Sequence, residues 1–124
     1  MSVGRGEIQK LGFLGEEYVA RYLRKKGCII IKRNWRDRYG EVDIIAEDKE
    51  NIIFVEVKTR TENAMVSGVE AVDTGKMRRI RNEAQMFVKR LNTDLPPRVD
   101  VAEVTVYRTQ DGKCKWKLNY IKNV

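Results

Sequence analysis

Apolar side chains recur at helical spacing in two segments of the chain. The first segment runs from about Lys10 to Lys26, and Gly27 directly after it is typical of a helix end. The second segment runs from about Thr74 to Leu91. Because each segment gathers its apolar residues on one side, each is predicted to be an amphipathic helix that packs against a core.

Five further segments are predicted to be strands, because they are rich in β-branched residues or alternate between apolar and polar positions. Their approximate bounds are Cys28–Lys32, Glu41–Glu47, Ile52–Thr59, Val99–Tyr107 and Lys113–Ile121. The element order is then αβββαββ. This order favours a mixed β-sheet with helices packed against it. The break at residues 92–98 is predicted to be a turn between elements, and no linker divides the chain, so we expect one α/β domain over residues 1–124.

A loop of four polar residues, 48–51, predicts the register of the hairpin between the second and third strands. The numbers of opposed residues then add up to 99, which places Asp43 across from Glu56 and Glu41 across from Lys58. Directly opposed residues share a face, with Cβ atoms roughly 4.5–5.5 Å apart. This charged face carries Glu41, Asp43, Ile45, Glu47, Ile52, Phe54, Glu56 and Lys58. The opposite face is almost wholly apolar and is predicted to be core; it carries Val42, Ile44, Ala46, Ile53, Val55, Val57 and Thr59.

Two carboxylates opposite each other in a sheet are destabilising unless something neutralises them. Asp43 and Glu56 could raise each other's pKa, pair with Lys58, or hold a divalent cation such as Mg²⁺ or Mn²⁺. With such a cation as Lewis acid and Lys58 to offset charge, the group has the parts for phosphodiester hydrolysis. The alternative is a solvated polar face with chance ion pairs. Ile45 and Phe54 count against it, because they predict that the charged face is partly covered.

The amino-acid composition limits the kinds of catalytic and binding site that the chain can form. The chain has 25 Lys and Arg, 18 Asp and Glu and no histidine, so its formal charge is +7. The absence of histidine excludes a Ser-His-Asp triad, a Cys-His nucleophile and imidazole metal sites. The positive charge favours a polyanion such as nucleic acid. No segment resembles a secretory signal or a membrane span. We therefore expect a cytoplasmic protein whose two cysteines, Cys28 and Cys114, are small buried hydrophobes.

Basic clusters with nearby aromatic residues are the candidate nucleic-acid contacts. One cluster directly precedes the acidic hairpin, and the rings within it could stack on bases or sugars. A second lies near the start of the second predicted helix. Each could equally be an ordinary solvated face. The candidate residues are Arg33, Trp35, Arg36, Arg38, Lys76 and Arg79. Because no base-reading motif is present, we expect contacts to the backbone or the shape of the nucleic acid.

Asp43 followed by Glu56-Val57-Lys58 resembles the PD-(D/E)xK motif of the restriction-endonuclease-like nucleases, with Val42 where the motif's name has proline. Four motifs in order look like the bacterial YraN family, which is endonuclease-like and similar in its core to archaeal Holliday-junction resolvases. They are Gly12-x-x-Gly15-Glu16, Arg33-Asn34-Trp35-Arg36, Gly40-Glu41-Val42-Asp43-Ile44-Ile45-Ala46 and Phe54-Val55-Glu56-Val57-Lys58-Thr59-Arg60. The similarity extends to Arg98-Val99-Asp100-Val101 and so covers most of the chain.

This resemblance implies a restriction-endonuclease-like fold and a metal-dependent endonuclease acting on DNA, including structured or branched DNA. It would make Asp43, Glu56 and the backbone carbonyl of Val57 the ligands of Mg²⁺ or Mn²⁺, and Lys58 and Glu16 further catalytic residues. It also makes a homodimer possible and supports Lys76 as a contact.

The sequence itself allows Glu16 to approach the sheet, because Gly12, Glu16 and Ala20 form one line along the helix. Glu16 could also be an ordinary exposed glutamate near a helix start. Asp100 is expected to pair with Arg98 rather than join the site. Two alternative functions remain open: a non-catalytic nucleic-acid-binding module, and an assembly partner that binds another protein through the hairpin charges.

Overall fold

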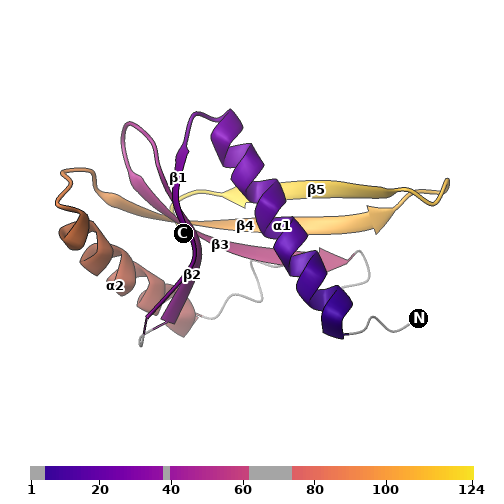
Figure 1. The fold of residues 1–124 in the computed structure, drawn as a ribbon, viewed down its shortest axis with the longest axis horizontal. Coiled ribbons are helices and arrows are strands. Elements are labelled where there is room, and N and C mark those ends of the chain that lie inside the picture. Colours follow the sequence, from indigo (N-terminus) through magenta and orange to yellow (C-terminus); the bar gives the residue numbers. More distant parts are fainter. Residues whose placement is uncertain (1–4, 38–39, 62–73) are drawn as a thin grey trace.

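The computed structural model describes residues 5–37, 40–61 and 74–124 (Figure 1). Its elements follow in the predicted order αβββαββ. They are α1 (Arg5–Lys25), β1 (Ile29–Asp37), β2 (Gly40–Glu47), β3 (Ile52–Thr61), α2 (Thr74–Leu91), β4 (Pro97–Arg108) and β5 (Cys114–Ile121).

One five-stranded sheet, in the order β1-β2-β3-β4-β5, forms the centre of the fold. Its neighbouring strands are antiparallel, except that β3 and β4 run parallel and are joined by a crossover that contains α2. The two helices pack against opposite faces of the sheet and bury separate clusters of apolar residues. The chain therefore has the expected α/β architecture, a mixed sheet flanked by helices. Among the described residues, no helix is long and apolar enough to cross a membrane.

Both faces of the β2–β3 hairpin are buried by a helix. On the α2 face, Ile45 and Phe54 are fully buried beneath Ile80 and Phe87 of the helix. On the α1 face, Val19, Ala20 and Leu23 pack against the cluster Ile44, Ala46, Ile53, Val55, Ala102 and Val104. The prediction that the charged face of the hairpin is partly covered is confirmed.

The first strand is longer than its β-branched residues predicted. It continues from Lys32 to Asp37 through the basic cluster, because these residues pair with β2 as far as Gly40. Pairing with a neighbouring strand here outweighs weak local β-propensity. The cysteines are both free; Cys28 is half-buried, whereas Cys114 is exposed, so the predicted burial is wrong for Cys114.

The alternation of β2 breaks at Asp43. Ile44 faces α1, as predicted, but Val42 packs with Ile45 against α2, so the predicted place of Val42 on the Ile44 face is wrong. The partner strand has a matching irregularity at Asn34, which lies between the pairs Arg33–Ile44 and Trp35–Val42 and has a φ of 52°. Asparagine is one of the few residues that tolerate this left-handed conformation. The end of the β1–β2 hairpin thus turns from the α1 side of the sheet to the α2 side.

Candidate active site

The β2–β3 hairpin has the predicted register but separates earlier than predicted. Its four ladder pairs run from Glu47–Ile52 to Ile44–Val55, and each pair of residue numbers adds up to 99. Beyond Ile44 the pairing ends, so the expected cross-strand pairs Asp43–Glu56 and Glu41–Lys58 are not part of the ladder. The break in alternation at Asp43 explains this, because it turns β2 away from β3. We call the place where the two strands separate, at Asp43 and Glu56 to Lys58, the fork.

The Asp43 side chain occupies the fork. If the β2–β3 ladder continued in the same register, Val57 would lie opposite Val42. Instead, the Val57 N–H donates a hydrogen bond of 2.8 Å to Asp43 Oδ2. The N–H and C=O of one residue point to the same side of a strand, so the Val57 carbonyl is also directed toward the fork. Standard backbone dimensions then place Asp43 Oδ2 within roughly 5.5 Å of the Glu56 Cα. The hydrogen bond therefore holds the first acid beside the Glu56-Val57-Lys58 backbone.

Glu56 and Lys58 follow each other on the α2 face of β3. Glu56 is only 2% exposed, and the Lys58 Nζ lies 3.5 Å from its Oε1. A buried carboxylate requires a partner, because transfer of a charge out of water is costly. The Lys58 side chain is one-third exposed and so connects the buried carboxylate with solvent.

Glu16 approaches the fork from α1, but through a different glycine than predicted. A Cβ on Gly15 would lie 1.9 Å from Thr59 Oγ1, so only glycine allows this closeness of α1 to β3. A Cβ on Gly12 would meet no atom within 4 Å, so the expected close approach at Gly12 is wrong. Ala20, the other small residue on the predicted helix line, is fully buried. Gly15, the second glycine of the first motif, therefore sets how near Glu16 comes to the sheet.

Burial raises the pKa of Glu16 above its usual value. A hydrogen bond with the Asn34 side chain and the charge of Arg33 oppose this shift, whereas the charges of Glu41 and Glu56 add to it. The influence of Glu56 indicates that the Glu16 carboxylate is electrically coupled to the fork. A carboxylate with a raised pKa in a partly buried site is a candidate for proton transfer.

Asn34 is the residue that sequence reasoning missed. It lies between the ladder pairs Arg33–Ile44 and Trp35–Val42, as Asp43 does on β2, and its side chain is hydrogen-bonded to Glu16. Its left-handed backbone allows β1 to change faces at this position. The available signal was an asparagine among basic and β-branched residues in a strand, where asparagine is unfavourable unless a special backbone conformation is required.

The predicted nucleic-acid contacts do not form one surface. Arg33 pairs with Glu17, lies 3.7 Å from Glu16 and stacks over the ring of Phe13 on the α1 side. The ring of Trp35 is half-buried on the α2 side, 5.5 Å from that of Phe87.

Two other predicted contacts lie nearer to solvent. The Nε of Arg36 lies 2.9 Å from Glu41 Oε2, and both side chains are well exposed. Arg79 is exposed and lines a cavity of about 210 Å³ with Gly40 and Glu41. Arg38 and the side chain of Lys76 lie outside the described residues.

The donor atoms at the fork fit a hard dication. Two carboxylates, from Asp43 and Glu56, and the Val57 carbonyl are oxygen ligands of the kind that Mg²⁺ and Mn²⁺ prefer. Within the described parts of the chain, no three His, Cys, Asp or Glu residues are grouped closely enough to hold a metal by themselves. A dication here would therefore depend on two carboxylates, a carbonyl and water, a set that suits Mg²⁺ because this ion usually keeps several waters.

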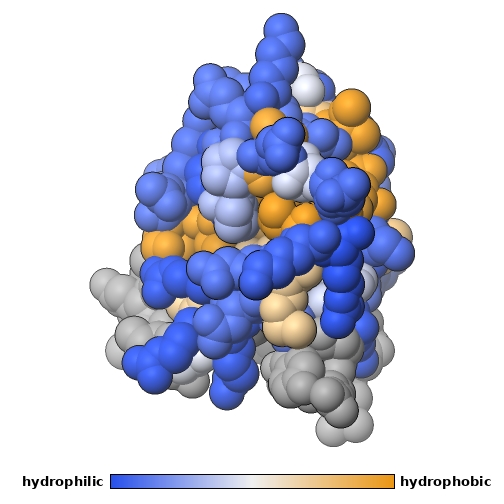
Figure 2. Space-filling model, turned by 90° about the vertical axis from the view of Figure 1, so that its left-hand side faces the viewer, coloured by the Kyte–Doolittle hydropathy of each residue, from blue (hydrophilic) through white to orange (hydrophobic). Residues whose placement is uncertain are grey.

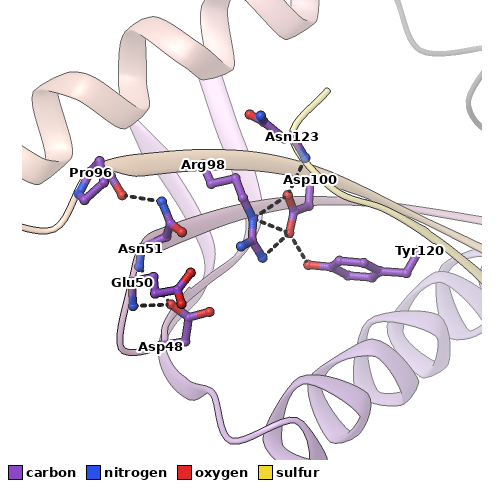
Figure 3. A network of polar contacts seen from close by, with 8 residues as sticks. All are labelled: Asp48, Glu50, Asn51, Pro96, Arg98, Asp100, Tyr120 and Asn123. Atoms are coloured by element: carbon purple, nitrogen blue, oxygen red, sulfur yellow. Dashed lines mark hydrogen bonds and ion pairs between the residues drawn. The ribbon is translucent and has the colours of Figure 1, made fainter.

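Asp100 pairs with Arg98, as expected, and belongs to a separate network (Figure 3). Arg98 donates to both carboxylate oxygens at 3.0 Å, the Tyr120 hydroxyl donates at 2.6 Å and the Asn123 N–H at 2.9 Å. Asp100 is fully buried, so these donors compensate its charge. The network fastens the C-terminal segment to β4 and has a structural role.

Comparison with known proteins gives one family. The profile described as "Uncharacterised protein family UPF0102" matches residues 15–104, which include Glu16, Asp43 and Lys58. A UPF0102 protein of Syntrophomonas wolfei is 41% identical over 116 residues, covering 93% of this chain and 96% of the relative. The UPF0102 protein TTE1452 of Caldanaerobacter subterraneus is 40% identical over 114 residues, covering 91% and 92%.

Among solved structures, this chain is similar to "The structure of Pyrococcus Furiosus SfsA in complex with Ca2+", at 13% identity and a TM-score of 0.47. The match covers 94% of this chain but 64% of that protein. A likeness this distant gives no information on activity or ligands.

Proposed function

We propose that this chain, which belongs to the UPF0102 family, is a metal-dependent nuclease that hydrolyses phosphodiester bonds in DNA. The membership confirms the family that the four sequence motifs resemble. One observation carries the proposal: the Val57 N–H holds the Asp43 carboxylate at the backbone of the Glu56-Val57-Lys58 segment. Both acids of the D…ExK pattern and its lysine are thereby brought to one fork.

Asp43, Glu56 and the Val57 carbonyl would hold Mg²⁺ or Mn²⁺, which supplies Lewis acidity toward a phosphate when bound. Lys58 places a positive charge beside Glu56 at the edge of solvent, where it can offset the negative charge of a phosphate. Burial raises the pKa of Glu16, which makes its carboxylate a better proton acceptor than an exposed glutamate. Asn34 and Arg33 orient that carboxylate.

Two exposed cations, Arg36 and Arg79, would contact the phosphate backbone. Arg36 and Arg79 are exposed on the β1–β2 hairpin and on α2, and either can reach a bound strand from its own side. Contacts of this kind position a nucleic acid without reading its bases. DNA, including branched DNA, is the substrate that the resemblance to resolvases favours. The proposal places the protein in the cytoplasm, and the homodimer remains a prediction.

Cleavage of end-labelled DNA by the purified protein tests the proposal. Duplex, single-stranded and four-way-junction substrates are incubated with Mg²⁺ or Mn²⁺, and products are resolved on denaturing gels. We expect cleavage of at least one substrate, and loss of cleavage in Asp43→Asn, Glu56→Gln and Lys58→Gln. Asp94→Asn, which removes an exposed acid from the loop before β4, is the matched control and should cleave normally. Equal cleavage by the wild type and all three fork variants would identify a contaminant and refute the assignment.

A non-catalytic nucleic-acid-binding module is the second candidate. It is favoured by the finding that no three potential ligands are grouped together in the described part of the chain. This candidate predicts salt-sensitive DNA binding without cleavage under any metal, and unchanged or tighter binding by Asp43→Asn. Cleavage that depends on Asp43 would exclude it.

A further inference from the structure

Among the described residues, none of the helices packs on the α2 face of the sheet beyond α2 itself. The helix packs on Ile52 and Phe54 of β3 and on Val99 and Val101 of β4, which lie in the first half of each strand. Further along, the same face of β3 carries Lys58 and then Arg60, because side chains alternate along a strand. Figure 1 shows β4 and β5 extending well past α2. This part of the sheet therefore begins directly at the fork.

The orientation of β5 follows from its contacts. Trp116 stacks on Tyr18 of α1 with ring centroids 5.7 Å apart, and Leu118 and Tyr120 pack on the same side. The residues that alternate with these three along β5 must therefore point to the α2 face; they are Lys115, Lys117 and Asn119. All three are exposed.

The strand register arranges these side chains in rows that start at β3. Lys58 pairs with Glu103, which pairs with Asn119, and Arg60 pairs with Thr105, which pairs with Lys117. A third pair joins Tyr107 to Lys115. We call this surface the open sheet face; its residues are Lys58, Arg60, Glu103, Thr105, Tyr107, Lys115, Lys117 and Asn119. It holds four cations and one acid, together with one aromatic ring.

A depression lies in the middle of the open sheet face. Its volume is about 380 Å³, and it is lined by Glu103, Thr105, Lys117, Leu118 and Asn119. The lining offers a cation, a hydroxyl and an amide, which are groups that bind phosphate and sugar oxygens. Glu103, which lines the depression, pairs with Lys58 on the neighbouring strand, so the depression is continuous with the fork.

We infer that the open sheet face binds the phosphate backbone of the nucleic-acid strand that leads away from the fork. The inference rests on the proposed function in taking nucleic acid as the partner. Its own support is the charge of the face, complementary to a polyanion, and its continuity with Lys58 through the strand register. Lys115 and Lys117 contact phosphates, and Tyr107 offers a ring on which a base stacks.

The outer face of α2 is the competing surface for the same partner. Among the α2 side chains whose exposure the structure describes, the exposed cations are Arg78, Arg79, Arg81, Lys89 and Arg90, and the single acid of the helix, Glu83, is buried. Figure 2 shows the end of the molecule where α2 lies, with hydrophilic side chains around smaller apolar patches. The far end of α2, at Lys89 and Arg90, is not linked to Lys58 by any strand pairing.

Fluorescence anisotropy separates the two surfaces. Labelled duplex and single-stranded oligonucleotides are titrated with the full chain in EDTA, at several salt concentrations, so that binding is measured without metal or cleavage. The test variant is Lys115→Gln with Lys117→Gln, and the matched control is Lys89→Gln with Arg90→Gln. Each removes two exposed cations.

We expect the β5 variant to bind more weakly and its log-log salt slope to fall in magnitude by about 1.8 for duplex or about 1.4 for single strands. The α2 control should keep the wild-type slope. Wild-type slopes in the β5 variant, or loss confined to the α2 control, would overturn the inference while leaving the nuclease assignment intact. A wild type that binds through β5 but never cleaves would refute the nuclease alone, and a wild type that binds neither oligonucleotide at low salt would overturn the inference.

Discussion

Two replacements of Asp43 distinguish its role as a hydrogen-bond acceptor from the role of its negative charge. Asp43→Ala removes the acceptor of the Val57 N–H, whereas Asp43→Asn keeps an acceptor oxygen and removes only the charge. A half-buried donor left without a partner costs about 1–3 kcal/mol of unfolding free energy. The asparagine variant retains a neutral hydrogen bond and should lose about 1 kcal/mol or less.

These energies correspond to measurable changes in melting temperature. For a chain of 124 residues, the unfolding entropy makes 1 kcal/mol equivalent to about 4 °C. We therefore expect Asp43→Ala to lower Tm by about 4–12 °C, and Asp43→Asn to lower it by about 4 °C or less. Differential scanning calorimetry without metal gives both values. Both variants should lose cleavage, because both lack the carboxylate.

Glu41→Ala is the matched control on the same strand. Its ion pair with Arg36 is well exposed, and exposed pairs contribute little. The control should melt within a few degrees of the wild type. If Asp43→Ala melts like the control, the hydrogen bond to Val57 does not hold the fork together. If Asp43→Asn is as unstable as Asp43→Ala, the charge rather than the acceptor atom stabilises the fork.

Three further predictions concern the surroundings of the fork. Gly15→Ala should lower the free energy of unfolding in urea by about 1–3 kcal/mol, because the new methyl group meets Thr59. Thr59→Gly in the same chain should restore most of the loss. An unchanged urea midpoint in Gly15→Ala would contradict the close approach of α1 to β3. The raised pKa of Glu16 means that its protonated form stabilises the fold below the usual pKa and that this contribution is lost as pH rises through the raised value. Glu16→Gln should therefore gain stability relative to the wild type as pH rises above the usual glutamate pKa, and a difference independent of pH would be inconsistent with that shift. Tyr120→Phe removes a hydrogen bond to buried Asp100 and should cost about 1.5–3 kcal/mol in the same unfolding assay, whereas a neutral effect would mean that Arg98 and Asn123 suffice.

The sequence predicted those parts of the fold that depend on local pattern. Apolar periodicity gave both helices, and the polar loop 48–51 gave the register that ends at Ile44 and Val55. These predictions succeed because a slip by one residue would expose a buried face. The bounds of α2 coincide with the predicted segment.

The fork itself could not be predicted, because it depends on contacts between distant residues. The alternation rule extrapolated through Asp43 and placed Val42 on the wrong face, since nothing local indicates that Asn34 adopts a left-handed conformation opposite it. Glu16 was placed near the sheet through Gly12, whereas helix rotation brings Gly15 to Thr59. Such rotation is fixed by packing rather than by periodicity.

The candidate nucleic-acid residues show a related limit. A basic cluster in the sequence became dispersed in the fold, because neighbouring residues of a strand point to opposite faces. Arg33 therefore pairs with α1, whereas Trp35 packs on Phe87 of α2. The open sheet face arises in the opposite way, from lysines on β5 that adjoin Lys58 only through the order of the strands.

We propose that the fork holds a dication between Asp43 and Glu56. Anomalous diffraction from a crystal soaked in Mn²⁺ tests it most directly, because the ion and its ligands are located together. We expect one strong peak in contact with both carboxylates and with the Val57 carbonyl, at metal–oxygen distances of about 2.0–2.3 Å. An empty fork at saturating Mn²⁺, or an ion bound only elsewhere on the chain, would contradict it.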